Sequence, residues 1–328
     1  MSGSDPVRWG VLSTANINEK VLVGARGTPT VDVVAVGSRS PERASEFAGR
    51  HGIPRAHGSY EELLADGGVE AIYIPLPNAM HVEWTLRALE AGKHVLCEKP
   101  LTAKPEEVER CFDAADEAGL VLSEAFMWRF HPQADRLVEL VRGGAIGELR
   151  LIRAAFSFPL AAAPNVRWDA ELEGGALMDV GCYCVSGSRL LAGEPERVHG
   201  EAVLAPSGVH ARFAGAMRFP GEVLATFDCG FDLPVRDELE AIGSEGSLFL
   251  DDPWHSLEPV IEVRGLDGSL ERVEVERRNP YECELEDLSL AIRGERRPRL
   301  GREDALGQAR VLEALTRSAD EAQPVVMA

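Results

Sequence analysis

The chain is poor in lysine, cysteine and aromatic residues, and it has no long apolar run. Its 328 residues include four lysines, six cysteines and 6% aromatic residues. No segment approaches the roughly 18 consecutive apolar residues of a membrane helix, and residues 1–6 lack the charged and apolar regions of a signal peptide. The cysteines are too sparse for a disulfide scaffold and match no zinc spacing, so we predict no metal site. We expect a soluble, cytoplasmic protein.

Positive charge is also scarce. Lysine and arginine together number 34 against 54 acidic residues, which gives a formal net charge of −20. A surface of this sign repels phosphate backbones and anionic membranes, so we expect neither nucleic acid nor a membrane as a partner. The length and the 45% apolar composition suffice for two domains, each with its own core.

The first part of the chain alternates short apolar runs with amphipathic segments. We predict strands at 8–12, 31–36, 71–74, 94–97 and 121–123, and helices at 16–26, 42–51, 60–66, 81–91 and 106–118. This alternation is typical of a parallel sheet wound with helices. We therefore predict an α/β domain that binds a dinucleotide over residues 1–124.

From residue 125 the pattern changes to one helix at 132–142, longer alternating strands at 149–158, 210–219 and 223–233, and a closing helix at 305–319. Turn pairs rich in glycine separate these strands, which favours a large, mostly antiparallel sheet with one face exposed or covered by a partner. We predict a second, α+β domain over residues 125–328.

The turn after the first strand stands where a dinucleotide fold carries its glycine-rich loop. Small residues let a backbone approach a pyrophosphate at a helix N-terminus, and here the candidates are Ser13, Thr14, Ala15, Asn16 and Ile17. Because the turn has no glycine, a plain helix-capping loop is the competing interpretation.

The residues after the second strand distinguish the two nicotinamide cofactors. An acidic side chain there would bind the ribose hydroxyls of NAD, whereas a serine and an arginine can hold a 2′-phosphate. Residues 37–40 contain no acid, and Ser38 and Arg39 are followed by Arg43. This pattern favours NADP over NAD, although the arginines could instead be solvated at a helix start.

Lys99 is the first catalytic candidate, because it is one of only four lysines and lies between Glu98 and Pro100. Lysine changes its protonation state on desolvation, which arginine does not. The competing interpretation is a surface lysine at a strand end.

Three segments carry a family resemblance: residues 75–81, 91–101 and 174–183. They resemble signatures of the Gfo/Idh/MocA oxidoreductases, and Tyr183 resembles the branch that includes glucose-fructose oxidoreductase, NADP-linked D-xylose dehydrogenase and dimeric dihydrodiol dehydrogenase. The resemblance implies an N-terminal Rossmann domain and a C-terminal open sheet that forms a homodimer or homotetramer. It also implies a cis Lys99–Pro100 bond and an enzyme that oxidises CH–OH groups.

The same resemblance assigns roles within those segments. Tyr183 corresponds to the family's catalytic tyrosine, and Lys99 would favour its phenolate. Either Lys99 or Tyr183 could carry the proton directly, and Asp179 would orient the substrate or the lysine. Next to the nicotinamide it implies Pro75, Leu76, Asn78, His81, Glu98 and Lys99. The alternatives are a buried phenol for Tyr183, a helix cap for Asp179, and a helix residue without a role for His81.

The aromatic and cationic residues Trp128, Arg129 and Trp168 suggest which class of substrate binds. Arg129 could donate to sugar hydroxyls, Trp128 could stack on a ring, and Trp168 could add a wall, although a plain aromatic core competes with these roles. Together with Asp179 and Tyr183 they predict a sugar or polyol substrate. The leading expectation is an NADP-dependent aldose 1-dehydrogenase for D-xylose or D-glucose. Alternatives are a dihydrodiol dehydrogenase, a keto-sugar reductase, a glycosidase that recycles bound nicotinamide, and a non-catalytic cofactor sensor.

Overall fold

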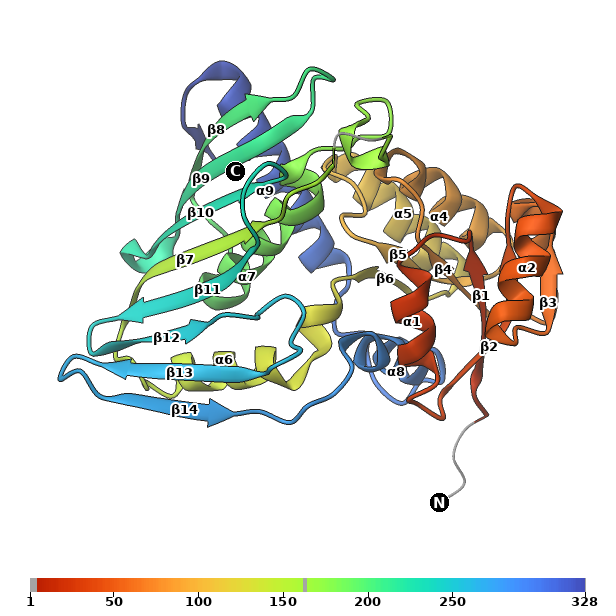
Figure 1. Ribbon diagram of the computed structural model, residues 1–328, viewed down its shortest axis with the longest axis horizontal. Helices are drawn as coiled ribbons and strands as arrows, with labels where there is room; N and C mark the ends of the chain where they lie inside the picture. Colours follow the sequence, from red (N-terminus) through yellow and green to blue (C-terminus); the bar gives the residue numbers. More distant parts are fainter. Residues whose placement is uncertain (1–4, 162–163, 328) are drawn as a thin grey trace. The chain divides into compact units, whose positions relative to one another are not determined.

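A computed structural model describes residues 5–161 and 164–327 (Figure 1). Residues 1–4, which include most of the segment scanned for a signal peptide, lie outside the described part. The chain divides into two compact units, Met1–Phe130 with Asn279–Leu306, and His131–Arg278 with Gly307–Ala328. The sequence pattern predicted one boundary, near residue 124, whereas the structure also groups residues 279–306 with the first unit.

Unit 1 contains a six-stranded parallel sheet in the order β3-β2-β1-β4-β5-β6. The strands are β1 (Val7–Leu12), β2 (Val31–Gly37), β3 (Arg55–His57), β4 (Ala71–Ile74), β5 (His94–Glu98) and β6 (Leu122–Ala125). Their order is that of the dinucleotide-binding fold, so the predicted Rossmann domain is confirmed. The carboxyl ends of all six strands lie at one edge of the sheet, where such folds bind their ligands.

Local sequence explains the helices of unit 1, which are α1 (Asn18–Ala25), α2 (Pro41–His51), α3 (Tyr60–Leu64), α4 (His81–Glu90), α5 (Pro105–Ala118) and α8 (Pro280–Ile292). In α2, the Ser40 side chain accepts the backbone N–H of Arg43, proline occupies the first turn, and Gly52 ends the helix with φ 70°. Helix α8 was not predicted. It packs closely on α1, because a Cβ at Gly24 would lie 2.6 Å from the backbone nitrogen of Glu282.

Unit 2 contains a nine-stranded sheet in the order β14-β13-β12-β11-β7-β10-β9-β8-β15. Its strands are β7 (Leu149–Ser157), β8 (Arg197–Leu204), β9 (His210–Arg218), β10 (Leu224–Gly230), β11 (Arg236–Gly243), β12 (Gly246–Leu250), β13 (Val260–Gly265), β14 (Leu270–Glu274) and β15 (Val325–Val326). Strands β7 and β10 pair in parallel and the other described pairs are antiparallel. This confirms the predicted, mostly antiparallel sheet.

One face of this sheet carries helices α6 (Pro132–Arg142), α7 (Cys182–Ala192) and most of α9 (Arg302–Glu321) (Figure 1). A π-helical turn, Leu177–Gly181, leads into α7. Gly181 allows this turn to approach strand β10, because a Cβ there would lie 2.9 Å from the Cys229 sulfur. All six cysteines lie among the described residues as buried free thiols. Among the described residues, no helix is long and apolar enough to cross a membrane.

A buried acid distinguishes the core of unit 1. Glu284 in α8 is fully buried, and neither of its carboxyl oxygens has a hydrogen-bond partner among the described residues. Burial above all, and then the nearby charge of Glu98, raise the pKa of Glu284 well above its usual range. The carboxyl group is therefore held in its neutral form inside the folded unit.

We predict that the stability gained by Glu284→Gln grows with pH. Below the pKa of glutamate in the unfolded chain, about 4.3, both states keep the proton. Above it the unfolded chain ionises while folded Glu284 stays protonated, so wild-type stability falls as pH rises towards the folded pKa. Urea unfolding at several pH values between about 4 and 8 measures this.

The exposed residue Glu117 in α5 provides the control, because Glu117→Gln should differ from wild type by a nearly constant amount. A pH-independent difference for Glu284→Gln would contradict a neutral buried carboxyl.

Candidate active site

The turn between β1 and α1 contains no glycine, yet one of its residues has a backbone conformation that favours glycine. Ser13 has φ 131°, a region that side chains rarely adopt. The Ser13 hydroxyl accepts the N–H of Ala15 at 3.2 Å and donates to the carbonyl of Pro75 at 3.4 Å. These bonds hold the strained residue in place and fix the turn against the end of β4.

Unused donors and an acceptor lie at the start of α1. No described group accepts the backbone N–H of Asn16 or Ile17. The buried Asn18 side chain donates to the Ser13 carbonyl at 2.8 Å, while its Oδ1 has no partner among the described residues. Exposed N–H groups at a helix N-terminus fit a pyrophosphate. The residues present therefore suit a dinucleotide despite the missing glycines.

The end of β2 presents the residues that were predicted for a 2′-phosphate. Ser38 is buried and its hydroxyl accepts the N–H of Ser40, whereas Arg39 and Arg43 are exposed. Burial raises the pKa of the Tyr60 phenol, and the Arg39 guanidinium beside it opposes the shift. The Arg39 guanidinium therefore lies beside the Tyr60 phenol, at the start of α3.

His81 ties together the segments that follow β4 and β5. The imidazole is fully buried, with Nδ1 2.8 Å from the carbonyl oxygen of Pro100 and Nε2 2.7 Å from that of Leu76. Both neighbours are carbonyl oxygens, so the ring lies between the two segments with one nitrogen directed at each. Asn78 begins the short 3₁₀ turn Asn78–Met80 immediately before this histidine. His81 was predicted to lie beside the cofactor or to have no role. In the structure its ring connects the segment after β4 with the segment after β5.

The segment around Lys99 is fixed on both sides. The Lys99–Pro100 bond is cis, as the resemblance implied. Glu98 accepts the Tyr73 hydroxyl at 2.6 Å and the Lys99 backbone N–H at 3.2 Å. The Leu101 N–H donates to the buried carboxylate of Glu124 at 2.7 Å. The half-buried Lys99 side chain therefore begins from a rigid backbone at the carboxyl edge of the sheet.

In unit 2, Asp179 and Tyr183 lie one helical turn apart, at the π-turn and the start of α7. Arg167 donates from Nε to the Asp179 carboxylate at 2.5 Å. Gly174 makes this pair possible, because a Cβ there would lie 2.5 Å from the carbonyl oxygen of Arg167. Trp168 was predicted to belong to the site and Arg167 was not, because its partner lies twelve residues further along the chain.

The Tyr183 ring is largely buried in an aromatic cluster that we define as Phe156, Tyr183 and Trp254. The rings of Phe156 and Tyr183 pack edge to face with their centroids 5.2 Å apart. The Trp254 ring centroid lies 5.9 Å from that of Tyr183. Neither Phe156 nor Trp254 was predicted to belong to the site. Their contribution comes from strand pairing and loop geometry, which local sequence does not specify.

The predicted substrate residues have varied surroundings. Trp128 is buried, and the Arg129 guanidinium lies 5.7 Å from its ring centroid. Arg129 also pairs with Asp304 at 3.3 Å. In unit 2, Trp168 packs edge to face on Phe231 at 5.2 Å. Trp128 and Arg129 belong to unit 1, whereas Trp168 belongs to unit 2 with Tyr183.

Two family models match the chain in these regions. The model described as "Oxidoreductase family, NAD-binding Rossmann fold" matches residues 7–126, and the "GFO/IDH/MocA C-terminal domain" matches residues 135–249. The chain belongs to the Gfo/Idh/MocA oxidoreductase family. The resemblance carried by the three sequence segments is thereby confirmed.

Several known proteins are similar to this chain along most of their length. A D-xylose 1-dehydrogenase (NADP(+)) from Haloferax volcanii is 37% identical over 317 residues, 95% of this chain and 97% of that protein. A trans-1,2-dihydrobenzene-1,2-diol dehydrogenase from Xenopus laevis is 36% identical over 73% of each chain. A solved 3-ketoreductase from Actinomadura kijaniata, in complex with NADP and TDP-benzene, is 32% identical, with a TM-score of 0.90 over 95% of this chain and 98% of that chain.

The strain at Ser13 predicts an inverted order of substitutions. Ser13→Gly should be more stable than Ser13→Ala by about 1 kcal/mol, because both variants lose the hydroxyl and only glycine accepts φ 131° without strain. Chemical denaturation of the two variants measures the difference.

Ser45, which is exposed inside α2, is the matched control. At that position alanine should be more stable than glycine by about 1 kcal/mol, the usual order in a helix. The same order at Ser13 would show that the turn is not strained.

Proposed function

We propose that this protein is an NADP-dependent dehydrogenase of a sugar or polyol, most specifically an aldose 1-dehydrogenase of the D-xylose or D-glucose type. The observation that carries the proposal is the set Lys99, Asp179 and Tyr183 in a chain of this family, with Lys99 on a rigid backbone and Asp179 fixed by Arg167. The similarity to the Haloferax D-xylose dehydrogenase supports the substrate class.

Each residue of the set has a distinct proposed role. Bound NADP would supply the acceptor for the hydride that leaves the carbinol carbon. Tyr183 takes the proton of the hydroxyl group, which a phenol with a pKa of about 10 can do at neutral pH only where a cation favours its phenolate. Lys99 supplies that positive charge and a hydrogen bond. Asp179, held by Arg167, orients the substrate hydroxyls.

The cofactor assignment rests on both ends of its predicted binding edge. The N–H groups of Asn16 and Ile17 suit the pyrophosphate, and Ser38, Arg39 and Arg43 suit a 2′-phosphate in the absence of an acid at residues 37–40. Pro75, Leu76 and Asn78 would border the nicotinamide, next to Glu98 and Lys99.

A second candidate is reduction of a keto-sugar. It is favoured by the 32% identity to the Actinomadura 3-ketoreductase, a protein similar over nearly the whole chain. The same residues would then act in reverse, with Tyr183 donating the proton to the alkoxide.

We also propose that a second copy of the chain covers the helix-free face of the unit 2 sheet. An open hollow on this face is lined by Arg153, Glu201, Thr226, Asp228, Glu240 and Phe249. Both charge signs alternate across the strands, since Arg153 faces Glu240 in the register of β7 with β11. A surface with both signs can be complementary to itself, as a two-fold interface requires.

We predict that Lys99→Met and Tyr183→Phe each lower kcat by roughly 10²- to 10⁴-fold, the usual contribution of a positioned proton-transfer group. The measurement is NADPH appearance with a panel of aldoses, polyols and dihydrodiols, and NADPH consumption with keto-sugars. Both variants should still bind NADP.

If the wild-type protein binds NADP but turns over none of these compounds, the dehydrogenase proposal is overturned. That result would favour a glycosidase with recycled nicotinamide or a cofactor sensor. Full activity of Tyr183→Phe would instead remove the tyrosine from proton transfer.

We predict that Arg39→Ala raises KM for NADP by about tenfold or more and leaves KM for NAD nearly unchanged, because only NADP loses a charge-assisted hydrogen bond. Arg50→Ala, at the exposed far end of the helix α2 that follows Arg39, should change neither value. Equal losses for both cofactors would argue against a 2′-phosphate contact.

We predict that the solution mass is that of a dimer or tetramer and that Ala216→Glu lowers it. Ala216 is an exposed small residue on β9 that faces Thr226 across the pair with β10. A new charge at a desolvated interface is costly. Ala65→Glu, on exposed surface of unit 1, should leave the mass unchanged. An Ala216→Glu protein with wild-type mass would exclude this face.

A further inference from the structure

A polar pair, His255 and Asp237, lies next to the aromatic cluster of Phe156, Tyr183 and Trp254. The proposed chemistry does not use this pair. The His255 ring meets Phe156 edge to face at 5.5 Å, and Phe156 meets Tyr183 at 5.2 Å. Asp237 in β11 stands directly opposite Phe156 in the register with β7. All of these residues belong to unit 2. A titratable pair is therefore separated from Tyr183 by a single aromatic ring.

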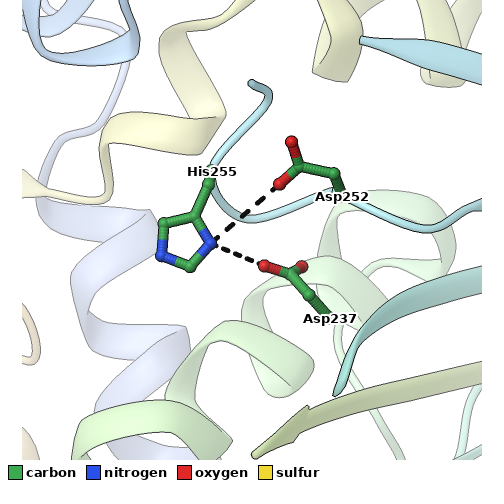
Figure 2. A group of neighbouring side chains, drawn as sticks. All are labelled: Asp237, Asp252 and His255. Carbon is green, nitrogen blue, oxygen red and sulfur yellow. Dashed lines mark hydrogen bonds and ion pairs between the residues drawn. The ribbon is translucent and has the colours of Figure 1, made fainter. Parts of the chain in front are cut away.

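Figure 2 shows how the pair is held. His255 Nδ1 lies 2.6 Å from Asp237 Oδ2 and 4.0 Å from Asp252 Oδ1. The other oxygen of Asp237 accepts the backbone N–H of Trp254 at 3.2 Å. Asp252 accepts the N–H groups of residues 257 and 258 through its second oxygen. The two carboxylates thus hold the segment 254–258 in place, and Asp237 also orients the imidazole ring.

This arrangement determines what the exposed side of the ring can do. Because Asp237 accepts the proton on Nδ1, the Nε2 of neutral His255 keeps its lone pair and is a hydrogen-bond acceptor. The His255 side chain is 33% exposed against 13% for Asp237. No residue in the described part of the chain hydrogen-bonds Nε2.

A metal centre is the other interpretation of these three side chains, whose candidate ligand atoms lie within 4.8 Å of one another. Two ligands of one tetrahedral zinc ion would be ~3.3 Å apart, given zinc–ligand distances near 2.0 Å. The Nδ1–Oδ2 separation of 2.6 Å is instead that of a direct hydrogen bond. The geometry favours a histidine–carboxylate pair.

We propose that His255 is a specificity-determining residue whose Nε2 accepts a hydrogen bond from a sugar hydroxyl remote from the carbon that is oxidised. Asp237 is then a positioning residue that fixes the imidazole tautomer. The partly exposed imidazole would then supply one polar contact on the far side of Phe156 from Tyr183, and a few polar groups of this kind suffice to orient a ligand. This inference deepens the proposed function and rests on it.

The test compares the preferred sugar with its monodeoxy analogues, each lacking one hydroxyl. His255→Ala should raise KM for the parent sugar by about tenfold, the size of one net hydrogen bond, and leave kcat within about threefold. For one analogue, which lacks the recognised hydroxyl, the variant and wild type should have nearly the same KM.

A double-mutant cycle tests the role of Asp237. Asp237→Asn keeps an acceptor for Trp254 but presents an amide to Nδ1, which reverses the tautomer and makes Nε2 a donor. It should change the same KM, and the double variant should be no worse than His255→Ala alone. His51→Ala is the control, because His51 also pairs with one carboxylate, that of Glu19, in unit 1.

Three outcomes would overturn the inference. His255→Ala could change KM equally for the parent sugar and every analogue, it could lower kcat and melting temperature together as a structural residue would, or EDTA could abolish and Mn²⁺ restore the discrimination.

Failure of the proposed function looks different, because the wild type would then turn over no sugar. In that case calorimetric binding of the same sugars to NADP-loaded protein is the readout. Equal affinities of wild type and His255→Ala, or no binding by either, would overturn the inference as well.

Discussion

The position of Lys99 depends on hydrogen bonds made by the residues on either side of it. Glu98 is held by the Tyr73 hydroxyl, the Pro100 carbonyl by His81, and the Leu101 N–H by Glu124. These partners come from different elements of unit 1, so the segment cannot shift without breaking several bonds at once. The side chain of a lysine on such a backbone starts from a fixed position. A positive charge that is to stabilise one particular oxygen atom has to be positioned in this way.

Unit 2 achieves a comparable rigidity by other means. The π-turn before α7 places Asp179 one turn ahead of Tyr183, and Arg167 reaches the Asp179 carboxylate because Gly174 allows close approach of the backbone. Single π-turns inside helices often mark functional positions, since they re-aim side chains. The aromatic cluster then limits the movement of the Tyr183 ring. Each unit therefore presents its polar groups from a well-packed support.

Sequence patterns predicted the elements with clear periodicity and local signals. Helix α6 and strand β4 have the predicted bounds, and the parallel sheet follows from the apolar runs. Helix α8 was missed because it is buried on most sides and carries the acids Glu284 and Asp287 inside, so it lacks a distinct apolar face. The φ of Ser13 could not be read from its residue type, because tertiary bonds impose it.

The candidate site was predictable only where a contiguous motif carried it. Lys99 and Tyr183 follow from the resemblance, whereas Arg167, Phe156 and the Asp237–His255 pair depend on strand register and turns that bring distant residues together. Such contacts have no local sequence signature. Their residue types are also common on surfaces, so nothing in the chain singles them out before the fold is known.

The most direct test of hydride transfer is to supply the preferred aldose with deuterium at C1 and analyse the released nicotinamide by mass spectrometry. We expect NADPH to gain one deuterium and the rate to fall by a primary isotope effect in single-turnover measurements. Deuterium lost to water or retained in the sugar product would contradict transfer from the carbinol carbon to the cofactor.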